Sequence, residues 1–323
     1  MVDYELFIIG LVPKAPAFIS FISSCYVMYE IIFSPARRSV IHYRLLLSMN
    51  LCTGIVACCQ FVGTWAIPRG TPFSYNAIGN ETSCNLQGSL LSICGLAIQH
   101  YYASLAVISY VSVMKSFKGK FNMKVEPFIH LWSLLYPIVL AAIALQNEYV
   151  NPAGAWCWID SNPSGCGSDV NVDCIHEVNG IYIHILTGTL YILTTLTVIM
   201  MILIYRKIRF DEKHNEQDDE NREEQQKKSK VLLIQIALYI FSYGGSYITI
   251  FIVRLIQWKT GVLNIPLYGA GIFLVSSQGF FNLIVYILLK SIVSSENILS
   301  YSDSNIARRT EISSSELSTT DVL

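Results

Sequence analysis

Seven apolar stretches, each long enough to cross a lipid bilayer, occupy most of this chain. Crossing about 30 Å of hydrocarbon takes about 20 helical residues. The stretches cover residues 15–33, 45–68, 84–114, 127–147, 181–205, 231–257 and 262–289. Only two of them carry a charged residue, Glu30 in the first and Arg254 in the sixth. Because they are continuous and far longer than the roughly 10 residues of a barrel strand, we predict an all-α membrane protein, a seven-transmembrane-helix bundle over 15–290.

The composition fits this interpretation. Hydrophobic residues make up 53% of the chain and charged residues 14%, whereas a soluble domain carries about 25% charge. The bundle leaves a short extracellular tail over 1–14, a charged loop over 207–230 and a Ser/Thr-rich tail over 291–323. No separate soluble domain fits between the spans.

The distribution of positive charge predicts how the bundle is oriented. Of the 22 lysine and arginine residues, 18 lie in the loops after the first, third and fifth helices and in the C-terminal tail. Cytoplasmic loops carry the excess of such residues, so the N-terminus is expected outside and the C-terminus in the cytoplasm, in a multi-pass protein of the plasma membrane. The basic residues expected to face a cytoplasmic partner are Arg37, Arg38, Lys115, Lys118, Arg206, Lys207 and Lys230.

Two further signals agree with this orientation. The sequon Asn80-Glu81-Thr82 falls on the expected outer side, which predicts glycosylation of Asn80. Of the nine cysteines, five lie deeper inside the helices, and the other four fall on the expected outer side, where disulfides persist. They are Cys84, Cys157, Cys166 and Cys174.

Four cysteines allow three pairings. We favour Cys84–Cys157, which ties the third helix to the second outer loop, together with Cys166–Cys174. The alternative is a zinc site made of Cys157, Cys166, Cys174 and His176, although that spacing matches no common zinc pattern. We expect no metal and no cofactor.

The cytoplasmic segments allow two interpretations each. Residues 207–230 are dense in charges of both signs and form either a solvated linker or extensions of the fifth and sixth helices that give a charged docking rim. The tail is either inert or phosphorylated, in which case it would recruit kinases and arrestin-like proteins. The candidate phosphorylation sites are Ser313, Ser314, Ser315, Ser318, Thr319 and Thr320.

Polar side chains inside the spans suggest where a ligand binds, because such groups are expensive in hydrocarbon and usually face the bundle interior. The densest set is Gln99-His100-Tyr101-Tyr102, near the middle of the third helix. Arg254 near the outer end of the sixth helix could hold an anion or extend to the membrane interface. The candidate ligand-binding residues are Gln99, His100, Tyr102, Trp156, Trp158 and Arg254.

Four local motifs together resemble a known receptor family. They read CNLQG at 84–88, AWCWI at 155–159, SQGFFNLIVY at 277–286 and YRLLLSMN at 43–50. Their order is similar to that of the cyclic-AMP-receptor-like G-protein-coupled receptors of amoebae and fungi, which are related to the secretin-like family 2 receptors. The resemblance covers about residues 40–290. Within these motifs, the residues expected to pack helices together are Asn50, Gln278, Asn282 and Tyr286.

The resemblance implies a receptor that senses an extracellular ligand and activates a heterotrimeric G protein. It also supports the pairing of Cys84 with Cys157. His100 and Tyr102 stand where such receptors often carry other aromatic residues, and the long outer hormone-binding domain of animal family 2 receptors is missing from the pattern. The identity of the ligand therefore does not carry over, and no nucleic-acid partner is expected.

Two other classes of function fit less well. A transporter or channel for a small solute is the alternative, but the halves show no internal repeat and the spans hold almost no acidic residue for a cation path. A membrane enzyme would need a motif such as paired metal-binding histidines or a nucleophile elbow, and we find none. A retinal protein would need a lysine in 262–289, which has none.

Overall fold

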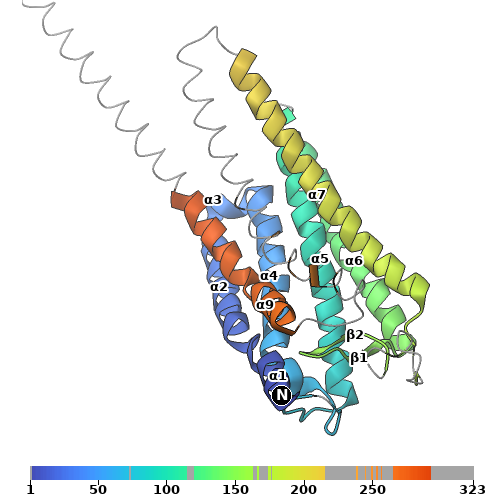
Figure 1. The fold of residues 1–323 in the computed structure, drawn as a ribbon. Coiled ribbons are helices and arrows are strands. Elements are labelled where there is room, and N and C mark those ends of the chain that lie inside the picture. Colours follow the sequence, from blue (N-terminus) through green and yellow to red (C-terminus); the bar gives the residue numbers. More distant parts are fainter. Residues whose placement is uncertain are drawn as a thin grey trace, which may run out of the picture.

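The computed structural model is mostly helical (Figure 1). It describes residues 2–72, 74–114, 120–162, 166, 174–175, 177–214, 238, 244, 249, 252–253, 256 and 265–291. The helices are α1 (Val2–Leu11), α2 (Lys14–Ile32), α3 (Pro35–Arg38), α4 (Ile41–Val62), the 3-10 turn η1 (Gly63–Ala66), α5 (Glu81–Met114), α6 (Lys120–Gln146), α7 (Gly180–His214), α9 (Ile265–Ser276) and a last helix, Gln278–Ser291. Two short strands, β1 (Val150–Pro152) and β2 (Cys157–Ile159), form a hairpin.

Long apolar helices dominate the described part of the chain, as expected of an all-α membrane protein. Five helices are long and apolar enough to cross a membrane, and α9 with Gln278–Ser291 adds a sixth candidate if this bent pair is counted as one span. These six correspond to the first five predicted spans and the seventh. The sixth predicted span, 231–257, lies almost entirely outside the described residues.

Two boundaries differ from the prediction. The expected tail over 1–14 contains α1, and the candidate span runs Phe7–Ile32, because the apolar sequence before Pro13 continues the first helix. The charged loop begins as helix, since α7 continues to His214. This agrees with the interpretation in which the fifth helix extends beyond the span.

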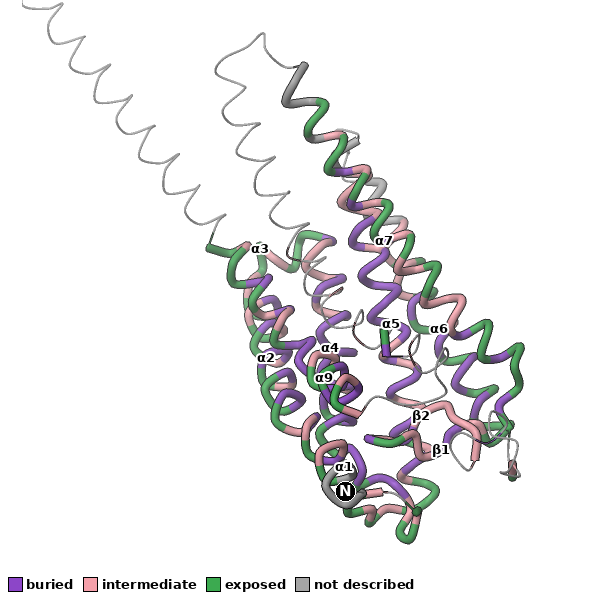
Figure 2. Tube along the Cα trace, viewed as in Figure 1, coloured by how far each residue is buried: buried purple, intermediate pink, exposed green. Residues whose placement is uncertain are grey.

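The bundle has two distinct ends (Figure 1). We call the end with β1 and β2 the hairpin end and the end with α3 the α3 end. Between them, α5 packs against α4, α6 and α7 and also against both strands. Buried residues follow α4 and α5, whereas α6 and α7 turn many exposed residues outward (Figure 2). The exposed side chains on α6 and α7 are largely apolar, such as Leu131 and Ile192, which suits contact with lipid.

The hairpin is attached to α5 by a covalent bond and by packing. Its strands are antiparallel, with Val150 opposite Ile159 and Pro152 opposite Cys157. Cys157 forms a disulfide with Cys84 in the first turn of α5. Both sulfurs are buried beside Ile67, so the hairpin lies against this end of the bundle.

The seventh predicted span, 262–289, is not one straight helix in the described part. α9 and Gln278–Ser291 meet at Ser277 with a bend of 47°. The break lies against α2, where the Ser20 hydroxyl donates to the Ser276 carbonyl at 2.5 Å and accepts from the Gly279 amide at 3.2 Å. Ser20 therefore supplies partners for backbone groups that the break leaves outside the regular helical pattern.

Gly279 lets the last helix approach α2 closely at this break. The approach can be tested by adding one methyl group. An alanine Cβ at Gly279 would lie 2.5 Å from the Ser20 carbonyl oxygen, so backbone must shift. We expect Gly279→Ala to lower the free energy of unfolding by about 1–3 kcal/mol, measured as a lower Tm in detergent. Gly95→Ala in α5 is the matched control, because its Cβ would meet no atom within 4 Å in the described part of the chain. An equal Tm for both variants would contradict the close approach.

Candidate functional site

A run of small and polar residues lines one face of α5 below the hairpin. Gly88, Ser92, Gly95 and Gln99 are spaced four, three and four residues apart, so they share one side of the helix. Ser92 and Gln99 are buried, with 4% and 2% of their surface exposed. We call this set the α5 face.

The α5 face combines open space with unused hydrogen-bonding capacity. A Cβ built on Gly95 meets no atom of the described residues within 4 Å. The Ser92 hydroxyl and the Gln99 side-chain carbonyl oxygen have no hydrogen-bond partner among the described residues. A buried polar atom without a partner costs about 1–3 kcal/mol, so this face favours a molecule that donates hydrogen bonds to it.

The hairpin covers the end of the α5 face. A Cβ on Gly88 would clash with Val150 and lie 3.3 Å from the Cys157 carbonyl oxygen, so the strands rest directly on this glycine. On either side of Cys157, Trp156 and Trp158 are half-buried and pack against the main core. Trp156 also contacts the cluster around Tyr268 of α9, and Trp158 the cluster between α6 and α7. The two indoles therefore join the hairpin to opposite sides of the bundle.

Gln87, next to the α5 face, is buried like Gln99, but both ends of its side-chain amide have hydrogen-bond partners. Its side-chain amide nitrogen donates to the carbonyl oxygens of Cys59 and Gly63 at the end of α4, both at 2.9 Å. Its carbonyl oxygen accepts the Cys157 backbone amide at 2.8 Å. One buried side chain thus joins α4, α5 and β2, and the free carbonyls at the C-terminus of α4 receive donors.

The predicted ligand-binding residues do not form one cluster. Gln99 lies on the α5 face, and the two tryptophans lie in the hairpin above it. His100 points elsewhere: its Nδ1 bonds the Leu96 carbonyl in its own helix at 2.9 Å, and its ring packs on Tyr136 of α6, 5.5 Å between centroids. His100 is thus a packing residue in this structure. Arg254 lies outside the described residues.

Tyr102 links α5 to the last helix rather than lining the open face. Its hydroxyl donates to the Asn282 side-chain oxygen at 2.5 Å, with both residues buried. Asn282 therefore packs helices together as predicted, and Gln278, one turn earlier, is equally buried. Asn50 is buried too, but the bond it donates goes to the Leu46 carbonyl of its own helix, not to a neighbouring one.

Two ionic networks connect the helices near the α3 end. In the first, which we call the Glu30 network, the Glu30 carboxylate of α2 accepts from Arg37 of α3 at 2.6 Å and from Lys290 at 2.7 Å. Arg37 also donates to the Tyr286 hydroxyl at 2.6 Å. Partial burial acts to lower the pKa of Arg37, but the hydrogen bond to Glu30 and the neighbouring groups raise it overall. The guanidinium therefore stays charged.

In the second, the Glu126 network, Arg44 of α4 forms a two-pronged pair with Glu126 of α6, at 2.5 and 2.6 Å. His130, one turn further along α6, lies 3.8 Å from the Glu126 carboxylate. The other nitrogen of His130, Nδ1, bonds the hydroxyl of Tyr101 on α5 at 3.1 Å. This network therefore holds α4, α5 and α6 together.

The outer cysteines pair as Cys84–Cys157 and Cys166–Cys174 in the structure, the two pairings favoured from the sequence. Because all four sulfurs are used, the zinc alternative loses its thiolate ligands. Among the described residues no group of three or more His, Cys, Asp or Glu side chains could hold a metal ion.

The remaining predicted sites lie at the surface or beyond the described residues. Asn80 is exposed and caps α5, since its side-chain oxygen accepts the Ser83 amide at 2.8 Å. Arg38 is exposed on α3, and Arg206 and Lys207 lie on the last turns of α7. The sites outside the described residues are Lys115, Lys118, Lys230, Ser313, Ser314, Ser315, Ser318, Thr319 and Thr320.

Sequence reasoning missed Ser92, Gly95 and the bridging role of Gln87. A signal was present, because small and polar residues recur at helical spacing along 88–99. The same spacing is common in ordinary packing between membrane helices, so the pattern alone does not indicate a site. Among the described residues, the open space beside Gly95 distinguishes this face from an ordinary packed helix surface.

Comparison of the chain with protein-family models and with curated proteins finds no match. The class that the fold and site define is therefore a helical protein with several apolar, membrane-length helices, a disulfide-tethered hairpin at one end and ionic networks at the other.

The two buried glutamines of α5 give a paired test of the site. Gln99→Leu removes a carbonyl oxygen that has no partner among the described residues. We expect it to raise the free energy of unfolding of the ligand-free protein by up to about 1–3 kcal/mol, and so to raise its Tm. Gln87→Leu breaks three buried hydrogen bonds and should lower stability by a similar amount or more. Thermal unfolding in detergent measures both. If Gln99→Leu destabilises the protein as strongly as Gln87→Leu, the α5 face is ordinary packing.

Proposed function

We propose that the chain is a seven-helix G-protein-coupled receptor of the plasma membrane. Its hairpin end faces outside and its α3 end faces the cytoplasm, where it activates a heterotrimeric G protein. The ligand is a small molecule that enters beneath the hairpin. The resemblance to the cyclic-AMP-receptor-like and secretin-like receptors and the orientation inferred from the basic loops support this proposal.

The observation that carries the proposal is the α5 face. Buried oxygens at Ser92 and Gln99 without partners among the described residues, beside the open space at Gly95, suit a bound ligand better than a packed interface. The hairpin that covers this face is tethered by Cys84–Cys157 and carries two tryptophans. A ligand held there touches the helix that packs against most of its neighbours.

A route for the signal runs from this face to the α3 end. One turn along α5 from Gln99 is Tyr102, whose hydroxyl bonds Asn282 in the last helix. One turn further along that helix is Tyr286, a member of the Glu30 network. A ligand that favours one of two helix arrangements shifts their populations, and these contacts are elements whose arrangement would change.

The receptor and the transporter interpretations separate in one cell assay. Cells that express the chain with a reporter of G-protein dissociation are screened with small metabolites. A hit should act at least about tenfold more weakly on Gln99→Leu, since about 1.4 kcal/mol corresponds to a factor of ten. Asn147→Ala, which loses a side-chain bond to the Ile143 carbonyl at the end of α6, should respond normally. Uptake of a solute without any G-protein response would favour a transporter and end the proposal.

The Glu126 network should hold the receptor in its resting arrangement. Glu126→Gln removes the charge that Arg44 pairs with, and a loss of about 1 kcal/mol from the resting state raises the minor population about fivefold. We therefore expect ligand-free G-protein activation to rise by about that factor, with surface expression measured in parallel.

Arg44→Gln should have the same effect, and the double variant should add little to either single one, because both remove one shared contact. Asn147→Ala, directly after α6 at the hairpin end, is the control. Unchanged basal activity in Glu126→Gln at normal expression would contradict a role of this network in switching.

A further inference from the structure

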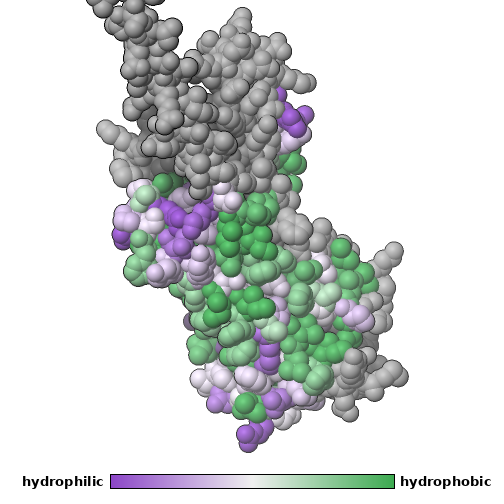
Figure 3. Space-filling view, turned by 90° about the vertical axis from the view of Figure 1, so that its left-hand side faces the viewer, coloured by the Kyte–Doolittle hydropathy of each residue, from purple (hydrophilic) through white to green (hydrophobic). Residues whose placement is uncertain are grey.

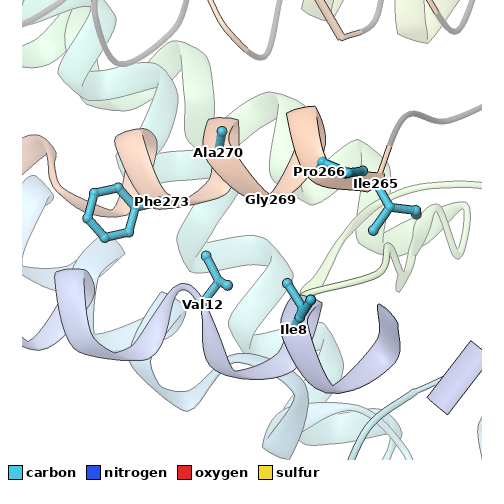
Figure 4. Close-up of a pocket in the computed structure, with 7 residues that line it drawn as sticks. All are labelled: Ile8, Val12, Ile265, Pro266, Gly269, Ala270 and Phe273. Atoms are coloured by element: carbon cyan, nitrogen blue, oxygen red, sulfur yellow. The ribbon is translucent and has the colours of Figure 1, made fainter. Parts of the chain in front are cut away.

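A groove separates α1 from α9 near the hairpin end (Figure 4). Ile8 of α1 and Val12, just after its end, form one wall, and Gly269, Ala270 and Phe273 of α9 form the other. Its volume is about 390 Å³, within the range of about 300–1,000 Å³ typical of small-molecule sites. It is separate from the α5 face and plays no part in the proposed route of the signal.

Short side chains on α9 create this space. The position where a Cβ of Gly269 would lie is 3.8 Å from Ile8, so the two helices are close but not interlocked there. Ala270 fills little of the gap, and Phe273 stands at one end of it (Figure 4). The groove is thus an elongated space between two nearly side-by-side helices.

The lining indicates the chemistry of the occupant. Every described side chain that lines the groove is apolar, so none of them can bind a charged headgroup or satisfy a hydrogen-bonding ligand. An elongated space with walls of this kind matches a hydrocarbon chain, which has no polar atom to satisfy.

The position of the groove indicates where the hydrocarbon comes from. Its walls belong to the candidate spans Phe7–Ile32 and Ile265–Ser276. On α2, which continues the same span, Phe18, Ile19 and Ile22 are at least half exposed and form a lipid-facing side. On this side hydrophobic surface covers the middle of the molecule and hydrophilic patches lie toward its ends (Figure 3). We propose that the groove binds one acyl chain of a bilayer phospholipid.

An acyl chain in this place fills the space next to the first half of the bent span. α9 ends at Ser276, whose carbonyl is held by Ser20 of α2. The lipid therefore supports α9 along the side where α1 leaves it unpacked, and Ser20 supports its end.

Photolabelling of the full chain in nanodiscs tests this proposal. The discs contain phosphatidylcholine with a photoactivatable diazirine in one acyl chain, and labelled peptides are located by mass spectrometry. Peptides with Ile8–Val12 and Gly269–Phe273 should be labelled about fivefold more than the exposed α6 peptide around Leu131. Ala270→Trp, at an exposed position, should remove this excess. Phe273→Ala, which enlarges the groove, should increase it.

The matched control is Ile22→Trp, an equally large side chain on exposed α2 surface, which should leave the excess intact. The proposal would be overturned if α1, α6 and α9 were labelled equally and Ala270→Trp did not change this labelling. Such a pattern is what the ordinary shell of lipid around the protein would give. Selective labelling by a photoactivatable sterol in place of the phospholipid, or crosslinks between two copies through α9, would overturn it as well. None of these readouts depends on G-protein activity.

Discussion

Hydrocarbon offers no hydrogen-bond partner, so every polar atom buried in such a bundle must find one within the chain, in water or in a ligand. Gln87 shows the requirement fully met, with three bonds that join α4, α5 and β2. Ser20 meets it for the backbone at the break of the last span. Gln99, three turns along α5 from Gln87, has a carbonyl oxygen without a partner among the described residues. This contrast, on one helix, is the reason why we propose Gln99 rather than Gln87 for a binding site.

The same requirement explains the shape of the two ends. At the hairpin end, a disulfide and the contacts of Gly88 fix the strands on α5. At the α3 end, charged side chains near the membrane boundary are grouped into the Glu30 and Glu126 networks rather than left single. Ion pairs of this partly exposed kind add little to stability. They suit an end of the bundle that changes its arrangement, because they can be broken and remade at modest cost.

Much of this architecture could be predicted from the sequence because its signals are local. Apolar runs located the described spans to within a few residues, except for the start of the first, and the cysteines on the expected outer side led to both disulfides. What could not be predicted depends on contacts between helices. The break at Ser277 rests on the approach of Gly279 to Ser20, and the direction of His100 depends on how α5 is rotated toward α6. Nothing in the sequence sets Ser92 and Gly95 apart, because the space beside them depends on where the neighbouring helices lie.

We propose that the chain crosses the bilayer an odd number of times, with the hairpin end outside. The most direct measurement places an epitope tag at each terminus and compares antibody access in intact and permeabilised cells. The account predicts that the N-terminal tag is accessible in intact cells and the C-terminal tag only after permeabilisation. Access to both tags, or to neither, in intact cells would contradict it.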